Sequence, residues 1–230
     1  MRAWGKIHFK SLFSSKSASK ASVPLIGSLL LLLILFVLVG AAFASYFNGS
    51  GGYMNFQPYV VNIEIKSCEG GLYWVGPEAE RASLEENFIV LDHKGGNSLP
   101  LKTTSIRING YGNSYHGIPG HEGSGRVEGN TIVYYSDLSS NGKNLDFYPK
   151  HNEKTIKDGY WDVGEKLILC GYDSAKGDSY SSVKVSVGGG KNTSDNYGFK
   201  AGSEIRVSII DVQGRNLLAD RTAVVECVKD

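Results

Sequence analysis

The feature of this sequence that most restricts its fold is a long uncharged stretch near the N-terminus. No charged side chain occurs from Ala21 to Asn62, residues 23–47 are mostly apolar, and residues 29–39 include no polar residue. About 20 apolar residues in a helix are enough to cross the hydrocarbon core of a bilayer. The stretch therefore predicts one long hydrophobic helix, which we place at residues 22–47.

The charges on either side of this helix predict its orientation. Five basic residues precede it, and no acidic residue occurs before Glu64; the five are Arg2, Lys6, Lys10, Lys16 and Lys20. Because basic flanks stay on the cytoplasmic side of a membrane, we expect a cytoplasmic N-terminus and an exported remainder. Without these five residues the chain has more acidic than basic side chains. We therefore expect no nucleic-acid partner.

Three fates of the apolar segment are compatible with the sequence. A secretory signal has an apolar stretch of about 7–15 residues before a cleavage site of the A-x-A type. Ala42-Phe43-Ala44 supplies such a site, although the apolar stretch here is longer than usual. An uncut segment would be a permanent membrane anchor. A cut between Ala21 and Ser22, before the apolar stretch, would leave the mature protein with a hydrophobic helix that has to be buried.

The residues around Lys20 favour this third fate. A basic residue and a small residue precede "SVPLIG", residues 22–27, which opens the apolar stretch. This arrangement resembles the class III signal peptide of archaeal type IV pilins and pilin-like proteins. In that family a prepilin peptidase cuts after the small residue, so the resemblance implies a processing site at Lys20, Ala21 and Ser22. Bacterial type IV pilins usually have a glutamate shortly after the cut, whereas Ile26 stands near that place here.

The composition of the helix agrees with this resemblance. Pro24 would lie in the first turn of the processed helix, where its missing N–H breaks no intrahelical hydrogen bond. Small residues allow helices to approach closely, although they are frequent in membrane helices of every kind. The positions that we expect to pack in a core of such helices are Pro24, Gly27, Leu31, Ile34, Leu38 and Gly40.

After the helix the sequence changes to that of a β-domain. Residues 48–58 are rich in Gly, Ser and Asn and predict a hinge. Beyond them, short apolar or alternating runs separated by turn residues predict strands at residues 59–67, 87–93, 104–110, 130–136, 166–172, 182–188, 204–212 and 222–228. Val212–Arg215 predicts a hairpin corner. Since no clear helices separate the strands, we expect residues 59–230 to form an immunoglobulin-like antiparallel β-sandwich in a mainly β protein.

Two segments of this domain extend the resemblance. "LDHKGGNSLPL", residues 91–101, and "YWDVGEKLIL", residues 160–169, are similar to recurrent segments of archaeal pilin-like proteins. The first contains the family motif His93-Lys94-Gly95-Gly96-Asn97. Its paired glycines supply positive φ angles, so we expect residues 94–97 to turn the chain. A phosphate-binding loop would need a helix after it, and none is indicated.

Residues that are open to covalent modification are few. Cys68, Cys170 and Cys227 allow at most one internal disulfide, and their spacing leaves the pairing open. Buried, unbridged cysteines are an equally acceptable interpretation. Asn48 and Asn192 each begin an N-x-S/T sequence in a polar loop, where an N-linked glycan could be attached.

Catalytic and metal-binding motifs are weak. His116, His121 and Glu122 are residue types that bind zinc, but they lie in a Gly- and Pro-rich stretch without a complete set of ligands. There is no nucleophile-elbow motif, and no Ser/His/Asp set stands out. We expect no enzymatic activity, no cofactor and no metal site.

Together these features lead to one expected function and one alternative. The resemblance implies a subunit of an archaeal type IV pilus-like surface filament, a homopolymer built by a pilus assembly ATPase and a membrane platform protein. Residues 1–21 would be a cytoplasmic leader on a membrane-inserted precursor, and the exported β-domain would be available for adhesion. The alternative is a membrane-anchored surface-binding domain with a single span, or a minor pilin outside the filament bulk.

Overall fold

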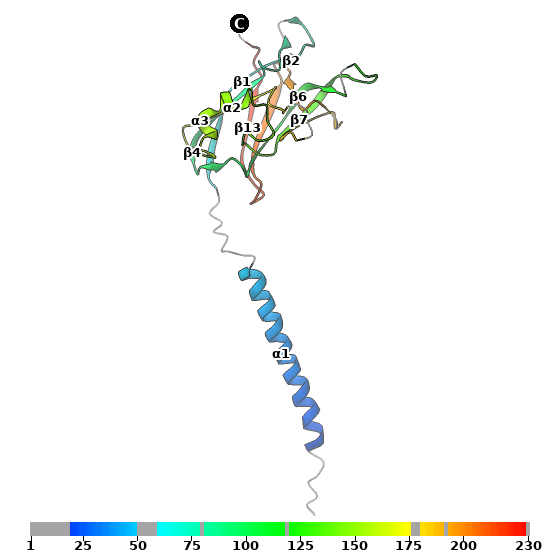
Figure 1. Cartoon of the computed structure of the whole chain (residues 1–230). Helices are drawn as coiled ribbons and strands as arrows, with labels where there is room; N and C mark the ends of the chain where they lie inside the picture. The colour runs from blue at the N-terminus through cyan, green and yellow to red at the C-terminus, as the bar shows by residue number, and fades with distance from the viewer. Residues whose placement is uncertain are drawn as a thin grey trace, which may run out of the picture. The chain divides into compact units, whose positions relative to one another are not determined.

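The computed structural model describes residues 19–49, 59–78, 81–117, 120–175, 180–190 and 193–228. The chain divides into two compact units, Met1–Gln57 and Pro58–Asp230. The first contains helix α1 (Ser19–Gly49), and the second contains every described strand (Figure 1). The expected fold class, mainly β with one long apolar N-terminal helix, is confirmed.

Helix α1 is apolar on all sides. Its central span, Ile26–Ala44, has a mean hydropathy of 2.9, and none of it is buried. Leu31 and Leu38 are 66% and 64% exposed. A helix that is apolar all round is stable inside a membrane or among other apolar elements. By its length and composition α1 can therefore cross a bilayer. A signal sequence can have the same length and composition.

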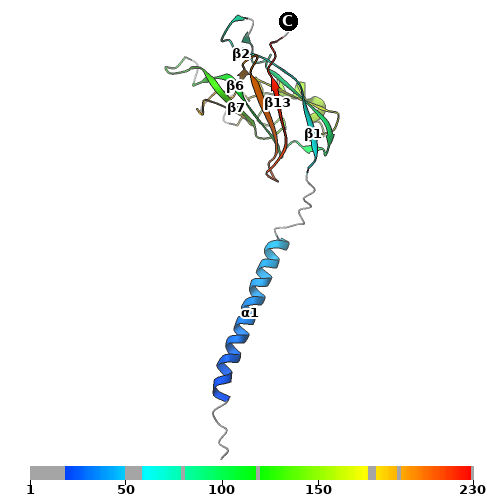
Figure 2. The ribbon, with the colours of Figure 1, turned by 180° about the vertical axis from the view of Figure 1, so that it is seen from behind.

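The β-domain consists mainly of two antiparallel sheets. The smaller sheet has the order β1-β4-β9, formed by Val61–Glu69, Phe88–Gly96 and Lys166–Cys170. The larger sheet has the order β10-β7-β6-β12-β13, with β11 also paired to β6; these strands are Val183–Val187, Gly125–Tyr135, Thr104–His116, Glu204–Asp211, Asn216–Val224 and Gly198–Phe199. Figure 2 shows the domain from behind.

Shorter elements complete the domain. They are the pair β2 and β3 (Leu72–Tyr73 and Arg81–Ala82), the pair β5 and β8 (Leu99–Pro100 and Tyr160–Trp161), and the one-turn helices α2 (Tyr148–His151) and α3 (Glu153–Ile156). The pattern of strands had not predicted α2 and α3. Each spans only four residues, which is too short for a helical period to show in the sequence.

Apolar side chains from both sheets form one core. Ile63 and Leu91 of the smaller sheet and Ile106 and Val207 of the larger sheet are at most 1% exposed. In β12 the buried side chains alternate with side chains that are exposed or half-buried. This alternation follows from the two-residue period of a strand, which places successive side chains on opposite faces.

The hairpin corner at Val212–Arg215 is confirmed, but the last strand begins earlier than predicted. β13 runs from Asn216 to Val224, whereas the apolar run had suggested 222–228. Asp211 and Asn216 pair directly, and the carboxylate of Asp211 accepts hydrogen bonds from the backbone N–H groups of Gln213 and Gly214. This tight turn returns the chain to the sheet at once, so polar residues occupy the start of β13.

The outer edge of β9 is closed by side chains instead of by another strand. Asn152 accepts a hydrogen bond from Ile168 N at 2.7 Å, and its amide donates to Ile168 O at 2.8 Å. The Thr155 hydroxyl donates to Lys166 O at 2.8 Å. The segment containing α2 and α3 therefore satisfies backbone groups that an open edge would offer to another chain.

The edges of β10 and β1 are also covered, by side chains and by one backbone N–H group. Asp195 accepts a hydrogen bond from Val185 N at 3.1 Å, and the Thr193 hydroxyl donates to Val185 O at 2.6 Å. On β1, Arg221 Nε donates to Ile63 O at 2.7 Å, and Glu226 N donates to Cys68 O. These contacts oppose edge-to-edge pairing between β-domains.

Candidate functional site

The expected processing site lies at the start of α1. Lys20, Ala21 and Ser22 belong to its first turn, because the helix begins at Ser19. Pro24 has no N–H to donate, so the carbonyl of Lys20 lacks its usual partner four residues later. The backbone around the Ala21–Ser22 bond is therefore held by fewer hydrogen bonds than the rest of the helix.

Five of the six expected packing positions share one face of α1. Pro24, Gly27, Leu31, Ile34 and Leu38 are spaced three, four, three and four residues apart, the spacing of a coiled-coil seam. An added Cβ at Gly27 would meet no other atom within 4 Å. Gly40 falls off this face, since the next seam position after Leu38 is residue 41.

The two segments that carry the family resemblance in the β-domain pack against each other. The ring of His93 is fully buried, and its centroid lies 5.7 Å from that of Trp161 in an edge-to-face arrangement. His93 N donates to Glu165 O at 3.0 Å, and Gly164 N donates to His93 O at 2.7 Å. Residues 91–101 and 160–169 thus belong to one packed unit, although about sixty residues separate them.

The glycine pair in the first segment lies at a strand end before the turn. β4 continues to Gly96, and the register shifts opposite Asn62 and Ile63, which marks a β-bulge. Gly96 has a φ of +105°, and a Cβ there would collide with Val60 O. The chain turns after it, where Asn97 N donates to Val60 O at 2.9 Å. The predicted turn is thus displaced by about two residues, because Gly96 is required for the close approach.

The three cysteines are free in this structure. Cys68 lies in β1 and Cys170 in β9, on opposite sides of β4, so these two thiols are not placed to form a disulfide. Burial raises the pKa of each to about 12. These thiols therefore stay protonated and unreactive at neutral pH. Cys227 is exposed.

The other expected modification and ligand positions are scattered. Asn48 lies in the last turn of α1, and Asn192 falls outside the described residues. His116 ends β6, and His121 and Glu122 lie in the connection to β7. Within the described residues, no group of three His, Cys, Asp or Glu side chains is arranged to hold a metal ion.

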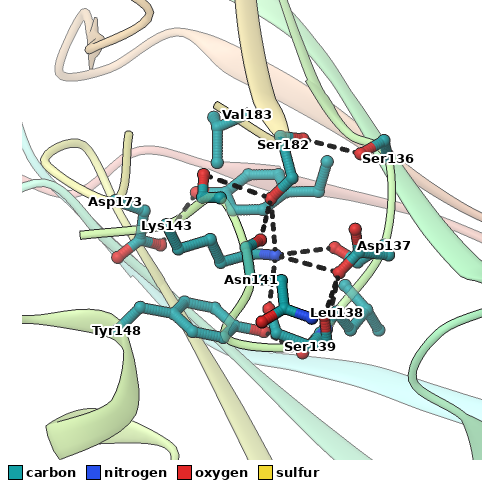
Figure 3. Close-up of polar contacts among 12 residues, drawn as sticks. Ser136, Asp137, Leu138, Ser139, Asn141, Lys143, Tyr148, Asp173, Ser182 and Val183 are labelled. Atoms are coloured by element: carbon teal, nitrogen blue, oxygen red, sulfur yellow. Dashed lines mark hydrogen bonds and ion pairs between the residues drawn. The ribbon is translucent and has the colours of Figure 1, made fainter. Parts of the chain in front are cut away.

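Sequence reasoning missed a buried lysine that fixes a loop of the β-domain. The side chain of Lys143 is completely buried. Its Nζ donates hydrogen bonds to Asp137 O, Ser139 O and Ser182 Oγ at 2.9, 2.6 and 2.9 Å, and lies 4.8 Å from the ring centroid of Tyr148 (Figure 3). Nζ is also 3.4 Å from the Asp137 carboxylate. No local pattern marks such a residue, because its burial and its contact with Ser182 arise only from the fold.

A second buried polar group lies close by and joins the two sheets. Asp173 Oδ2 accepts hydrogen bonds from Tyr135 OH at 2.9 Å and from Cys170 N at 2.7 Å. Tyr135 OH also lies 2.9 Å from Tyr197 OH. Burial raises the pKa of Asp173 to about 7, against the lowering effect of these hydrogen bonds and of Lys143. The group is enclosed by protein, so its effect is on stability.

The titration of Asp173 predicts a pH-dependent stability. Between pH 3.8, its ordinary pKa, and about pH 7 the folded chain keeps a proton that the unfolded chain has released. The free energy of unfolding should therefore fall as pH rises through this window, by at most roughly 4 kcal/mol at 1.36 kcal/mol per pKa unit. Asp173→Asn should remove this fall. Urea denaturation in detergent micelles at several pH values measures it.

The control for this experiment is Asp146→Asn, at an exposed position. This variant should keep the pH dependence of the original protein. If Asp173→Asn showed the same slope between pH 4 and pH 7 as the control, the buried carboxyl group would not be the titrating group.

The described parts therefore offer one long apolar helix and one β-domain whose apolar core contains a few buried polar groups. Searches against protein-family models, curated proteins and solved structures find no match to this chain. The function has to be inferred from these features and from the resemblance of the motifs.

Proposed function

We propose that this protein is a structural subunit of an archaeal type IV pilus-like surface filament. The observation that supports this most is the surface of α1, which is apolar on every side and unburied over Ile26–Ala44. Exposing apolar surface to water costs about 25 cal/mol per Å². Such a helix needs lipid around it, or other helices of the same kind.

In this proposal the helices of other copies are the final surroundings of α1. The seam of Pro24, Gly27, Leu31, Ile34 and Leu38 gives each helix a face on which a partner helix can pack. In the precursor this face contacts lipid, and in the filament it contacts neighbouring helices. A mature helix that starts at Ser22 is about 40 Å long at 1.5 Å per residue.

Processing precedes assembly in this proposal. A prepilin peptidase removes residues 1–21 on the cytoplasmic side, where the missing hydrogen bond to Lys20 O leaves the backbone less constrained. An assembly ATPase and a membrane platform protein then transfer the helix from the bilayer into the growing filament. The β-domain remains outside and is available for adhesion. Because its strand edges are covered, subunits of the filament are held together by their helices and not by pairing of β-strands from different subunits.

The same helix would also serve as an uncut membrane anchor, which is the alternative function. Its length and composition suit a single span. The N-terminal residue of the mature protein distinguishes these two functions from each other and from simple secretion. The filament subunit starts at Ser22, an anchored protein at Met1, and a secreted protein cut after Ala44 at Ser45.

Intact-mass measurement of the protein from its native cells tests the proposal. We expect a mature chain that starts at Ser22, and we expect a variant with both Lys20→Gln and Ala21→Leu to keep its leader. The matched control is Ala18→Leu, which should be processed normally. A mature chain of unchanged mass in the double variant, or one that starts at Ser45, would refute this function.

A further inference from the structure

The β-domain has a groove to which the proposed function assigns no role. Its volume is about 440 Å³, and it is bordered by residues 100–102, 139–141, 156 and 158–160. This volume lies within the range of about 300–1,000 Å³ that is typical of small-molecule sites. The three segments are distant in the sequence and are brought together by the fold.

The walls of this groove are fixed by hydrogen bonds at its base. Leu101 is 1% exposed; its N–H donates to Gly159 O at 3.0 Å, and its carbonyl accepts from Leu138 N at 2.8 Å. The backbone N–H and C=O groups of Leu101 thus connect both walls. On the wall of residues 139–141, the buried Lys143 Nζ donates to Ser139 O at 2.6 Å (Figure 3). A preformed groove of this kind loses little conformational entropy when a ligand binds.

The groups around the groove suit a ligand with both apolar and hydroxyl surfaces. Tyr160 lines one wall and is 48% exposed, which leaves its ring available for stacking. Ser140 and Asn141 line the opposite wall with a hydroxyl and an amide. Lys102 and Asp158 contribute one positive and one negative charge. These two charges cancel, so the groove does not favour a phosphate or another strongly charged ligand.

We propose that this groove binds a neutral oligosaccharide. The C–H face of a sugar ring stacks on Tyr160; its hydroxyl groups donate to the Asp158 carboxylate and exchange hydrogen bonds with the Asn141 amide. A pyranose ring combines these two surfaces, whereas an apolar peptide or a lipid would leave the polar side of the groove unpaired. The proposal goes beyond the filament function and does not depend on it, since the groove belongs to the β-domain alone.

The test uses the full chain in micelles of lauryldimethylamine oxide, a detergent without a sugar group. The probes are maltotriose, cellotriose and triacetylchitotriose, which are all neutral, and binding is measured by saturation-transfer NMR and calorimetry. At least one probe should bind, and Tyr160→Ala should bind it about tenfold more weakly, a loss of about 1.4 kcal/mol. Asn141→Ala should also weaken binding.

Tyr180→Ala is the matched control, because Tyr180 is 92% exposed and lies outside the groove. It should bind the sugar as the original protein does. Circular dichroism checks that each variant is folded. The proposal is overturned if none of the three sugars binds at millimolar concentration, or if Tyr160→Ala binds as tightly as the control. Because binding is measured on unassembled protein, a failure of filament assembly would not affect this result.

Discussion

Ile34→Arg is expected to abolish filaments while leaving the β-domain folded. Ile34 lies on the seam of α1, near the middle of its apolar span. An arginine at the centre of a membrane helix costs about 2.5–3.5 kcal/mol during insertion. Among packed helices its unpaired charge would be still less favourable. Sheared surface filaments, examined by electron microscopy and immunoblotting, should lack the variant protein.

Ile34→Leu is the control for this prediction, since it keeps the apolar volume of the seam. It should give filaments in normal amount. Circular dichroism should show the same β-structure in both variants, because α1 and the β-domain are separate units. Abundant filaments built from the Ile34→Arg protein would contradict assembly through this face of the helix.

Lys143→Met is expected to destabilise the β-domain by about 3–5 kcal/mol, the usual cost of breaking a buried ion pair by removing one partner. Methionine fills much of the space but cannot donate to the carbonyls of Asp137 and Ser139 or to the Ser182 hydroxyl. These half-buried acceptors would then lose their donor, and the Asp137 carboxylate would lose its cation. The midpoint of urea denaturation, followed by tryptophan fluorescence, measures the loss.

Lys94→Met is the matched control, because Lys94 also pairs with a carboxylate but is 47% exposed. Surface ion pairs contribute about 0–1 kcal/mol, so this variant should remain close to the original stability. If both lysine variants unfolded at the same urea concentration, the buried hydrogen bonds of Lys143 would not be a main source of stability.

The sequence predicted the larger elements well because their patterns are local. The uncharged stretch alone indicated α1, and the alternation of Val61, Ile63 and Ile65 indicated β1. Turn residues likewise located the corner between β12 and β13. Each of these signals depends on neighbouring residues in the chain, which are visible before any fold is known.

The features that escaped prediction depend on contacts between distant residues. Lys143 and Ser182 are separated by 39 positions, and Asn152 reaches Ile168 across 16. Neither pair has a local motif. The displaced turn has the same origin, because Gly96 is constrained by the backbone of Val60, just before β1. The groove beside Tyr160 likewise arises only when three separate segments meet.

The covered edge of β1 has a mechanical consequence. β1 is the first strand after the segment that leads from α1, so tension transmitted through the chain reaches the β-domain there first. β1 is attached to β4 along one edge and to Arg221 and Glu226 along the other. When the pull runs along the strand, these bonds share the load in shear and do not open one after another. The first strand of the β-domain is thereby suited to bear force.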